Sequence, residues 1–273
     1  IAISGDGQYM LAVELSGYAY ISTDYGANWN QISALPQGPY TGCAISGDGQ
    51  YQTIVGQITG SGSYLYRSVD YGVNWNAVSL YYQGTSPTPL AFPNDDFTGV
   101  AMSSSGSYQT LITQINPSNF EAGFVFRSTN GTSNPASFYT ATVPGSFDPR
   151  YYDVTCSPDG AKQFVAGQRS GSALTYPWML YKSTNYGANF SQVGAGYPWI
   201  KTAVNDTSIS FGVLCANDYI KVINASNVVS NLTAGGARNW RCIDVSNDGA
   251  YILAGAINGL FLSTDYGTTF TAL

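Results

Sequence analysis

Ser22–Trp29 reads STDYGANW, and the same pattern returns as SVDYGVNW at Ser68–Trp75 and as STDYGTTF at Ser263–Phe270. A fourth copy, STNYGANF at Ser183–Phe190, keeps the spacing but carries an amide in place of the acid. The side chain at the third position can accept backbone N–H bonds in a tight turn, and the glycine two residues later tolerates a positive φ. The aromatic residue at the end of the pattern begins the next strand and buries apolar area over the turn. The pattern therefore predicts hairpin turns held by Asp24, Asp70, Asn185 and Asp265, in a structural role.

A second regularity is the residue that closes the first strand of each repeat. It is serine in five repeats and asparagine in one, at Ser4, Ser46, Ser103, Ser157, Asn205 and Ser246. The intervals of 42, 57, 54, 48 and 41 residues suit blades of about 40–50 residues with loop insertions. Short alternating runs between turn residues indicate an all-β chain.

The pattern S-x-D-x-G-x-x-W resembles the Asp-box of the BNR repeat family, whose members are β-propellers with the fold of the sialidase superfamily. The resemblance covers the whole chain and implies a six-bladed β-propeller with four antiparallel strands per blade. Asp-box turns are then expected between the third and fourth strands. We expect a single domain over 1–273, with blades at about 1–33, 40–79, 97–142, 151–193, 199–233 and 240–273.

An aromatic residue leads into the first strand of every repeat except the first, at Tyr40, Phe97, Tyr151, Trp199 and Trp240. A residue type repeated at one position of successive blades is typical of packing between blades. The positions at which the repeats begin and end predict that each blade is built from one continuous segment, with no strand exchanged between the first and last blades. Ring closure is therefore expected to depend on packing between the sixth and first blades, unless residues outside this sequence supply it.

The composition argues against several classes of function. Charged residues are only 10%, against about 25% in ordinary domains, and the formal net charge is −6. No basic run exists to bind nucleic acid, and no apolar run reaches the ~18 residues of a membrane helix. A neutral, hydroxyl-rich surface is typical of secreted and cell-surface proteins, so we expect an extracellular or cell-surface location.

The absence of histidine excludes Ser-His-Asp and Cys-His catalysis, as well as the commonest zinc sites. No D-x-D-x-D spacing exists for calcium, and we expect no metal and no cofactor. Cys43 and Cys156 stand where other repeats carry apolar residues, so they are expected to be buried. Cys215 and Cys242 fall in neighbouring repeats and are candidates for a disulfide.

Sialidases of the resembling family carry an Arg-Ile-Pro segment, three arginines and a Tyr-Glu pair with an acidic Asp. This chain has no Arg-Ile-Pro, no arginine in the first repeat, and only two glutamates, Glu14 and Glu121. The only acids in first strands are Asp153 and Asp244, in different repeats, and the sequence does not bring them together. The favoured function is that of a non-catalytic structural, adhesive or assembly module, which could also form filaments. A carbohydrate-binding protein or a sialidase-like glycoside hydrolase is the alternative.

The remaining candidate residues do not repeat and lie in loops on one propeller face, where binding residues collect. As a ligand-binding set we name Glu121, Arg150, Arg169, Tyr176, Trp178, Gln114 and Gln168. The competing interpretation is that these side chains are solvated loop residues without a ligand, and that the glutamines form a hydrogen-bonded network between blades. The apolar members of this face also suggest self-association into a fibre or surface assembly, through Tyr82, Phe92, Tyr176 and Trp178. Donation of a strand from residues upstream of Ile1 and a monomeric propeller inside a longer protein are the alternatives.

Sequons for N-glycosylation occur at Asn130, Asn189, Asn205, Asn224 and Asn231. Composition alone gives nearly as many, so their number proves little, but three of them fall in the degenerate fifth repeat. Asn224 replaces the acid of the lost turn and is also a candidate turn cap. We expect a glycoprotein.

Overall fold

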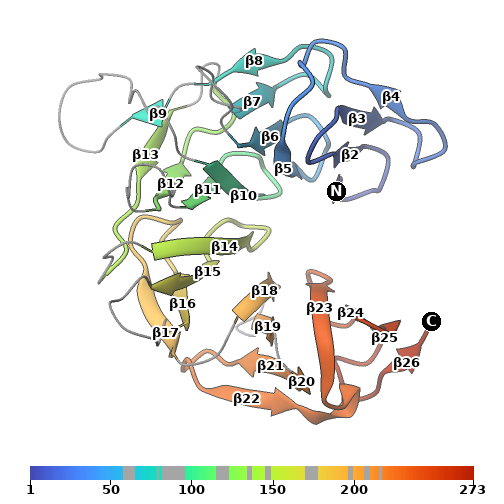
Figure 1. Cartoon of the computed structure of the whole chain (residues 1–273), viewed down its shortest axis with the longest axis vertical. Coiled ribbons are helices and arrows are strands. Elements are labelled where there is room, and N and C mark those ends of the chain that lie inside the picture. Colours follow the sequence, from blue (N-terminus) through green and yellow to red (C-terminus); the bar gives the residue numbers. More distant parts are fainter. Residues whose placement is uncertain are drawn as a thin grey trace.

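A computed structural model describes residues 1–57, 65–78, 80–81, 96–114, 123–133, 137–144, 149–169, 178–195, 199–205, 210–214 and 217–273. The described strands form six sheets (Figure 1). The first sheet contains β1 (Ala2–Ile3), β2 (Met10–Val13), β3 (Ala19–Ser22) and β4 (Asn30–Gln31). The second contains β5 (Tyr40–Ile45), β6 (Gln52–Gly56), β7 (Leu65–Ser68) and β8 (Asn76–Ala77). The third contains β9 (Leu80–Tyr81), β10 (Asp96–Met102), β11 (Gln109–Gln114), β12 (Val125–Ser128) and β13 (Phe138–Thr140).

The second half of the chain continues the pattern. The fourth sheet contains β14 (Pro149–Cys156), β15 (Gln163–Arg169), β16 (Trp178–Ser183) and β17 (Ser191–Ala195). The fifth contains β18 (Trp199–Val204), β19 (Ser210–Leu214), β21 (Ile220–Ile223) and β22 (Val229–Leu232). The sixth contains β20 (Asn217–Asp218), β23 (Arg238–Val245), β24 (Ile252–Ala256), β25 (Gly259–Ser263) and β26 (Thr271–Ala272). The 3-10 turn η1 (Thr233–Gly235) is the one helical element of the described ranges.

Each sheet takes four antiparallel strands in chain order, and β9 and β20 add a fifth strand to two of them. β9 pairs in parallel with β13, whereas β20 pairs antiparallel with the start of β23. The all-β propeller architecture with antiparallel four-stranded blades is confirmed.

The turns between third and fourth strands are held as the sequence predicted, and we call them S-x-D turns. In the first one, Ser22 Oγ donates to Asp24 Oδ1 (2.9 Å), and the backbone N–H of Asn28 donates to the same oxygen (2.9 Å). Tyr25 and Gly26 both have a positive φ, 60° and 81°. The same bonds recur around Asp70, Asn185 and Asp265. Each carboxylate or amide therefore stabilises a sharp local reversal of the chain.

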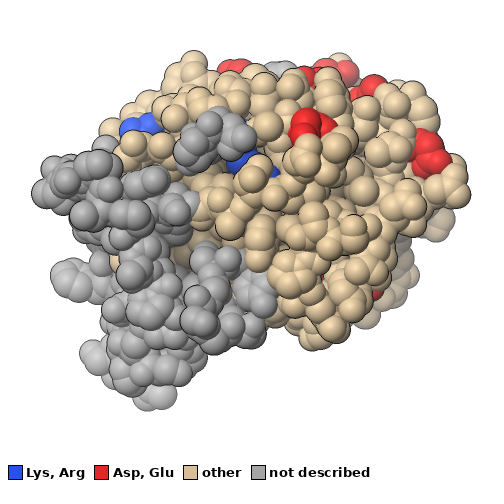
Figure 2. Space-filling view, turned by 90° about the horizontal axis from the view of Figure 1, so that it is seen from above, with Lys and Arg blue, Asp and Glu red and all other residues tan. Residues whose placement is uncertain are grey.

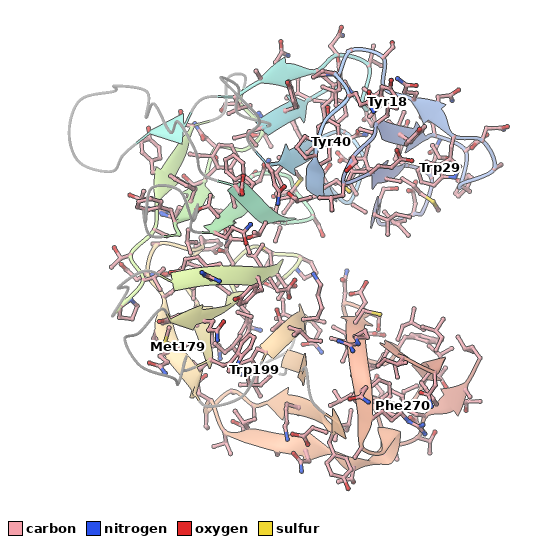
Figure 3. All side chains as sticks on the ribbon, in the orientation of Figure 1. Tyr18, Trp29, Tyr40, Met179, Trp199 and Phe270 are labelled. Atoms are coloured by element: carbon pink, nitrogen blue, oxygen red, sulfur yellow. The ribbon has the colours of Figure 1, made fainter. Side chains whose placement is uncertain are left out.

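The aromatic residues that lead into the first strands pack between neighbouring sheets. Their side chains are at most 1% exposed: Tyr40, Phe97, Tyr151, Trp199 and Trp240. Figure 3 places Tyr40 between the first two sheets and Trp199 between the fourth and fifth. The register of each first strand shifts just after this aromatic, as between Tyr151 and Asp153. Such a bulge re-aims the side chains that follow it. The predicted packing role of the five aromatics is confirmed.

The six sheets form an open arc, not a closed ring (Figure 1). Within the arc, β5 packs on β2, β10 on β5, β14 on β10, β18 on β14 and β23 on β18. No corresponding pair joins β23–β26 to β1–β4 in the described ranges, and Figure 1 shows an opening between them. The packing between the sixth and first blades on which closure of the ring was expected to depend is therefore not seen in the described residues.

Charged side chains are sparse on the face in Figure 2, where red and blue atoms are scattered over a mostly neutral surface. The described ranges contain no helix with the length and apolar character needed to cross a membrane.

Candidate central-channel site

The first strands of all six sheets surround one cavity of about 400 Å³, which we call the channel cavity. Its charged lining residues in the described ranges are Asp153 on β14, Lys201 on β18 and Asp244 on β23. The remaining wall is mostly apolar or carries small hydroxyl groups and two thiols. The structure thus brings Asp153 and Asp244 to the same cavity, which the sequence did not indicate.

Asp153 is the most firmly held group of this cavity. It is only 7% exposed. Lys201 Nζ donates to its Oδ1 (2.7 Å), while the backbone N–H and the hydroxyl of Thr202 donate to its Oδ2 (2.7 and 2.9 Å). Burial raises the pKa of Asp153, and the Lys201 ammonium and Thr202 donors oppose that rise. These three bonds cross from the fourth sheet to the fifth and join the two blades.

Asp244 differs because its carboxylate is not paired with a cation among the described residues. Its Oδ1 accepts a bond from the backbone N–H of Val245 (2.8 Å). The side chain is exposed to the channel, yet the surrounding walls displace enough water that burial raises the pKa of Asp244. Asp244 is therefore the acid of the channel cavity that carries no bound cation among the described residues.

The two thiols of the channel are poor nucleophiles. Cys43 and Cys156 are half-buried free cysteines, and burial raises the pKa of both, that of Cys156 to about 12. Both side chains also pack against apolar clusters between sheets, in agreement with the sequence-based interpretation. Cys242 is an exposed free thiol, so the disulfide considered with Cys215 is not formed; Cys215 lies outside the described residues.

The predicted loop-face residues come together in part, at the end of the fourth sheet. Arg150 pairs with Gln168 across β14 and β15, and Gln168 pairs with Trp178 across β15 and β16. Tyr152, which the sequence analysis did not name, donates its hydroxyl to Gln168 Oε1 (2.9 Å), and its ring lies 5.6 Å from that of Trp178. We call Arg150, Tyr152, Gln168 and Trp178 the rim cluster.

The other members of that set are not gathered with the rim cluster. Gln114 ends β11 in the third sheet, and Arg169 follows Gln168 in β15. Glu121 and Tyr176 lie outside the described residues, as do the predicted contacts Tyr82 and Phe92. Glu14 lies beyond the end of β2, where its carboxylate accepts the backbone N–H of Tyr18 (3.3 Å), and it is not part of the channel wall.

Four of the five sequon asparagines are exposed, and one is not. Asn205 is 2% exposed, because it packs against the turn at Gly249 of the next sheet, so the prediction of a glycan there is wrong. Asn224 accepts the backbone N–H of Val228 (2.9 Å) and caps its turn. The exposed set is Asn130, Asn189, Asn224 and Asn231.

Lys201 was not predicted from the sequence, although the sequence contains a signal for it. Asp153 and Lys201 both stand four residues before the residue that closes the first strand, at a position where the second and third repeats carry Gly42 and Gly99. Opposite charges at one position of consecutive repeats indicate a contact between blades. No group of three or more acids, cysteines or histidines gathers in the described ranges to hold a metal.

No protein-family model matches the chain, and no curated protein is similar to it in sequence. Among solved structures, it is similar to the Niastella koreensis GH74 enzyme, with a TM-score of 0.64 and 15% identity over 99% of this chain and 46% of that one. It is similar to YCF48 bound to D1 peptide, with a TM-score of 0.65 and 12% identity over 99% of this chain and 79% of that one. The likeness is one of fold: the chain is a β-propeller. A GH74 xyloglucanase from Xanthomonas campestris is also similar (TM-score 0.59, 14% identity, 97% of this chain and 44% of that one). The propeller described here spans less than half of these GH74 chains.

Proposed function

We propose that this propeller is a non-catalytic extracellular module that serves as a structural, adhesive or assembly scaffold. The observation that carries the proposal is how its acids are used. The carboxylates of the S-x-D turns and of the turns after the first strands accept local bonds from serine hydroxyls and backbone N–H groups: Asp6, Asp24, Asp48, Asp70, Asp159, Asp248 and Asp265. Asp153 is bound to Lys201 and Thr202. A two-carboxylate hydrolase needs a pair of acids about 5–10 Å apart that are free to react, and among the described residues of the channel wall only Asp244 has a carboxylate without a bound cation.

The rim cluster supports a binding role. Trp178 and Tyr152 offer aromatic surface, and Arg150 and Gln168 offer hydrogen-bond donors beside it. Aromatic residues and arginine are the side chains that dominate protein interfaces. YCF48, a propeller of similar fold, has been solved with a bound peptide, which is compatible with such a role.

The test measures self-association and sugar release on the same preparation. Light scattering against protein concentration should show assemblies larger than one chain. Trp178→Ala should raise the protein concentration needed for assembly at least tenfold. Val73→Ala should leave that concentration unchanged, because Val73 is an exposed apolar residue at the opposite ends of the strands. A strictly monomeric particle at high concentration contradicts the assembly role.

The alternative function is a glycoside hydrolase, and the specific observation in its favour is that Asp153 and Asp244 face one cavity. Incubation with sialosides and with a panel of β-glucans should release no sugar. Release that disappears in Asp244→Asn but persists in Glu14→Gln would establish the hydrolase and overturn the scaffold proposal.

We also propose that the chain is an extracellular glycoprotein carrying glycans at exposed asparagines. Intact-mass measurement of protein from its native source should show added mass, and peptide mapping should find it at Asn130, Asn189, Asn224 or Asn231. A bare polypeptide in that measurement contradicts this part of the proposal.

A further inference from the structure

Neighbouring sheets of the arc meet by one repeated arrangement. The second and third strands of a sheet present two apolar side chains to the lead-in aromatic of the next sheet, and all of these residues are buried. The sets are Val55 and Leu65 against Phe97, Ile112 and Val125 against Tyr151, and Ala166 and Leu180 against Trp199. We call the face of a sheet that receives this aromatic its outgoing face, and the face that carries the aromatic its incoming face.

The outgoing face of the sixth sheet has nothing to receive. Leu260 stands at the repeat position of Leu65, yet it is 40% exposed whereas Leu65 is 0% exposed. Leu253 is 39% exposed, whereas Leu11, at the same position of the first sheet, is 0% exposed. Since Leu253 pairs with Leu262 and Gly255 pairs with Leu260, these residues form one continuous apolar face on β24 and β25.

Cys242 belongs to the same outgoing face. It stands at the position of Gly42, where an added Cβ would lie 3.5 Å from the Cα of Gly99 in the next sheet. It also lies over Gly255, since a Cβ on that glycine would meet Cys242 Sγ. In the second sheet this position touches its neighbour closely, but in the sixth it is exposed.

The incoming face of the first sheet is uncovered in the same way. Trp29 is 38% exposed, and Figure 3 shows it in the sheet that borders the opening. Its counterpart Trp75 packs against the core shared with the first sheet, and its counterpart Phe190 is 5% exposed in the core shared with the third. Ile3 is 53% exposed, whereas its counterpart Cys156 packs into the core shared with the preceding sheet.

From these two faces we infer that the opening is a docking site for one further four-stranded antiparallel sheet, carried by the same protein outside residues 1–273. A single sheet of this repeat has one incoming and one outgoing face. It would cover the Leu253–Leu260 face with its lead-in aromatic and receive Trp29 on its own second and third strands. A second six-sheet copy does not suit this site, because the arc already turns through most of a circle and the opening is smaller than the arc (Figure 1).

Cys242 reports whether the outgoing face is covered. The experiment compares the chain of residues 1–273 with the full-length gene product, both monomeric and in mild reductant, during maleimide labelling followed by peptide mapping. Cys242 should react at least about tenfold more slowly in the longer chain, since a covered thiol reacts only through local opening. Cys43 and Cys156, already packed between sheets, should react slowly in both and serve as internal controls.

A pair of matched substitutions gives a second readout. Leu65→Ser should lower the Tm of both chains, because Leu65 is buried in both. Leu260→Ser should lower it in the longer chain but leave the 1–273 chain within about 1 °C.

Four results overturn the inference. Equal labelling of Cys242 in the two chains shows that no added sheet covers the face. Slow labelling of the dilute 1–273 chain shows that six sheets close the ring by themselves, and protection that grows with protein concentration assigns the face to a second copy. A natural protein that ends with these 273 residues also overturns it.

Discussion

Replacing Asp153 by alanine tests the bonds that join the fourth and fifth blades. The substitution removes the acceptor of three hydrogen bonds. Their donors are Lys201 Nζ and the backbone N–H and hydroxyl of Thr202. Thr202 is 7% exposed, so water does not readily replace the lost acceptor. Lys201 is different, because 48% of its side chain is exposed and its ammonium can turn to solvent.

The expected cost follows from that difference in exposure. An unsatisfied buried N–H costs about 1–3 kcal/mol, and a hydroxyl that can rotate costs less. The ion pair adds about 1 kcal/mol at most, since half-exposed pairs are screened by water. Together these give a loss of about 3 kcal/mol, or a fall in Tm of roughly 6 °C for a domain of this size. Asp153→Asn should lose about half as much, because it keeps one oxygen for Thr202.

Urea unfolding followed by tryptophan fluorescence measures the loss, and its pH dependence separates charge from packing. Burial raises the pKa of Asp153 above the unfolded value of about 3.9, so the folded chain binds that proton more tightly. The contribution of this group to stability is therefore present below the unfolded pKa and declines as pH rises through the folded pKa. Lys201→Met removes the opposing cation and should steepen that decline. The reasoning is refuted if the free energy of unfolding of Asp153→Ala lies within about 0.5 kcal/mol of that of the parent. It is also refuted if the stability of Lys201→Met changes with pH in parallel with that of the parent.

The remaining predictions concern turns and blade contacts. Gly72→Ala should destabilise the chain by about 2 kcal/mol in urea, because φ is 83° and the new Cβ would clash with Ile21 Cδ1. Gly7→Ala (φ 80°) should lose only about 1 kcal/mol, because its new Cβ would lie 3.9 Å from Tyr25 Cδ1, an ordinary contact. Thr53→Val should cost about 1–3 kcal/mol, since Gln109 Oε1 loses its donor (2.9 Å) in a buried contact between sheets; no loss would show that water replaces the hydroxyl. Hydrogen bonds from Asn28 lower the pKa of Asp24, and those from Thr269 lower the pKa of Asp265. The contribution of these two carboxylates to stability is present above their unfolded pKa and is lost as pH falls through their folded pKa. Circular dichroism should therefore show acid unfolding below about pH 4, and the unfolding of Asp24→Asn should depend less steeply on pH.

The sequence predicted those features of the fold that depend on residues close together in the chain. The S-x-D turns were predictable because Ser22, Asp24 and Asn28 make all their bonds within seven residues. The packing of Tyr40 and Trp199 followed from repetition at a fixed offset. The open arc was not predictable in this way, because the angle between neighbouring sheets depends on side-chain volumes in each interface and not on any local pattern.

The candidate site was predictable only in its parts. Asp153 and Asp244 were recognised as unusual acids of first strands, but that both line one cavity follows from the curvature of the arc. Arg150, Gln168 and Trp178 meet because β14, β15 and β16 pair in register, which fixes which strand ends are adjacent. Tyr152 escaped notice because the bulge after Tyr151 turns it towards Gln168 and Trp178, and a bulge has no reliable signal in one sequence.

The position four residues before the end of each first strand shows how a repeat acquires an individual role. In the second and third sheets it is Gly42 and Gly99, and the backbones approach closely; in the fourth and fifth it is Asp153 and Lys201, which form an ion pair. Because Asp153 faces the fifth sheet and Lys201 faces the fourth, this charged pair stabilises the contact between the fourth and fifth blades. Glycine at this position permits any neighbour, whereas Asp153 left without Lys201 and Thr202 would be a buried charge, which costs several kcal/mol. The same position in the sixth sheet carries Cys242, which is exposed because no neighbouring sheet covers it in the described ranges.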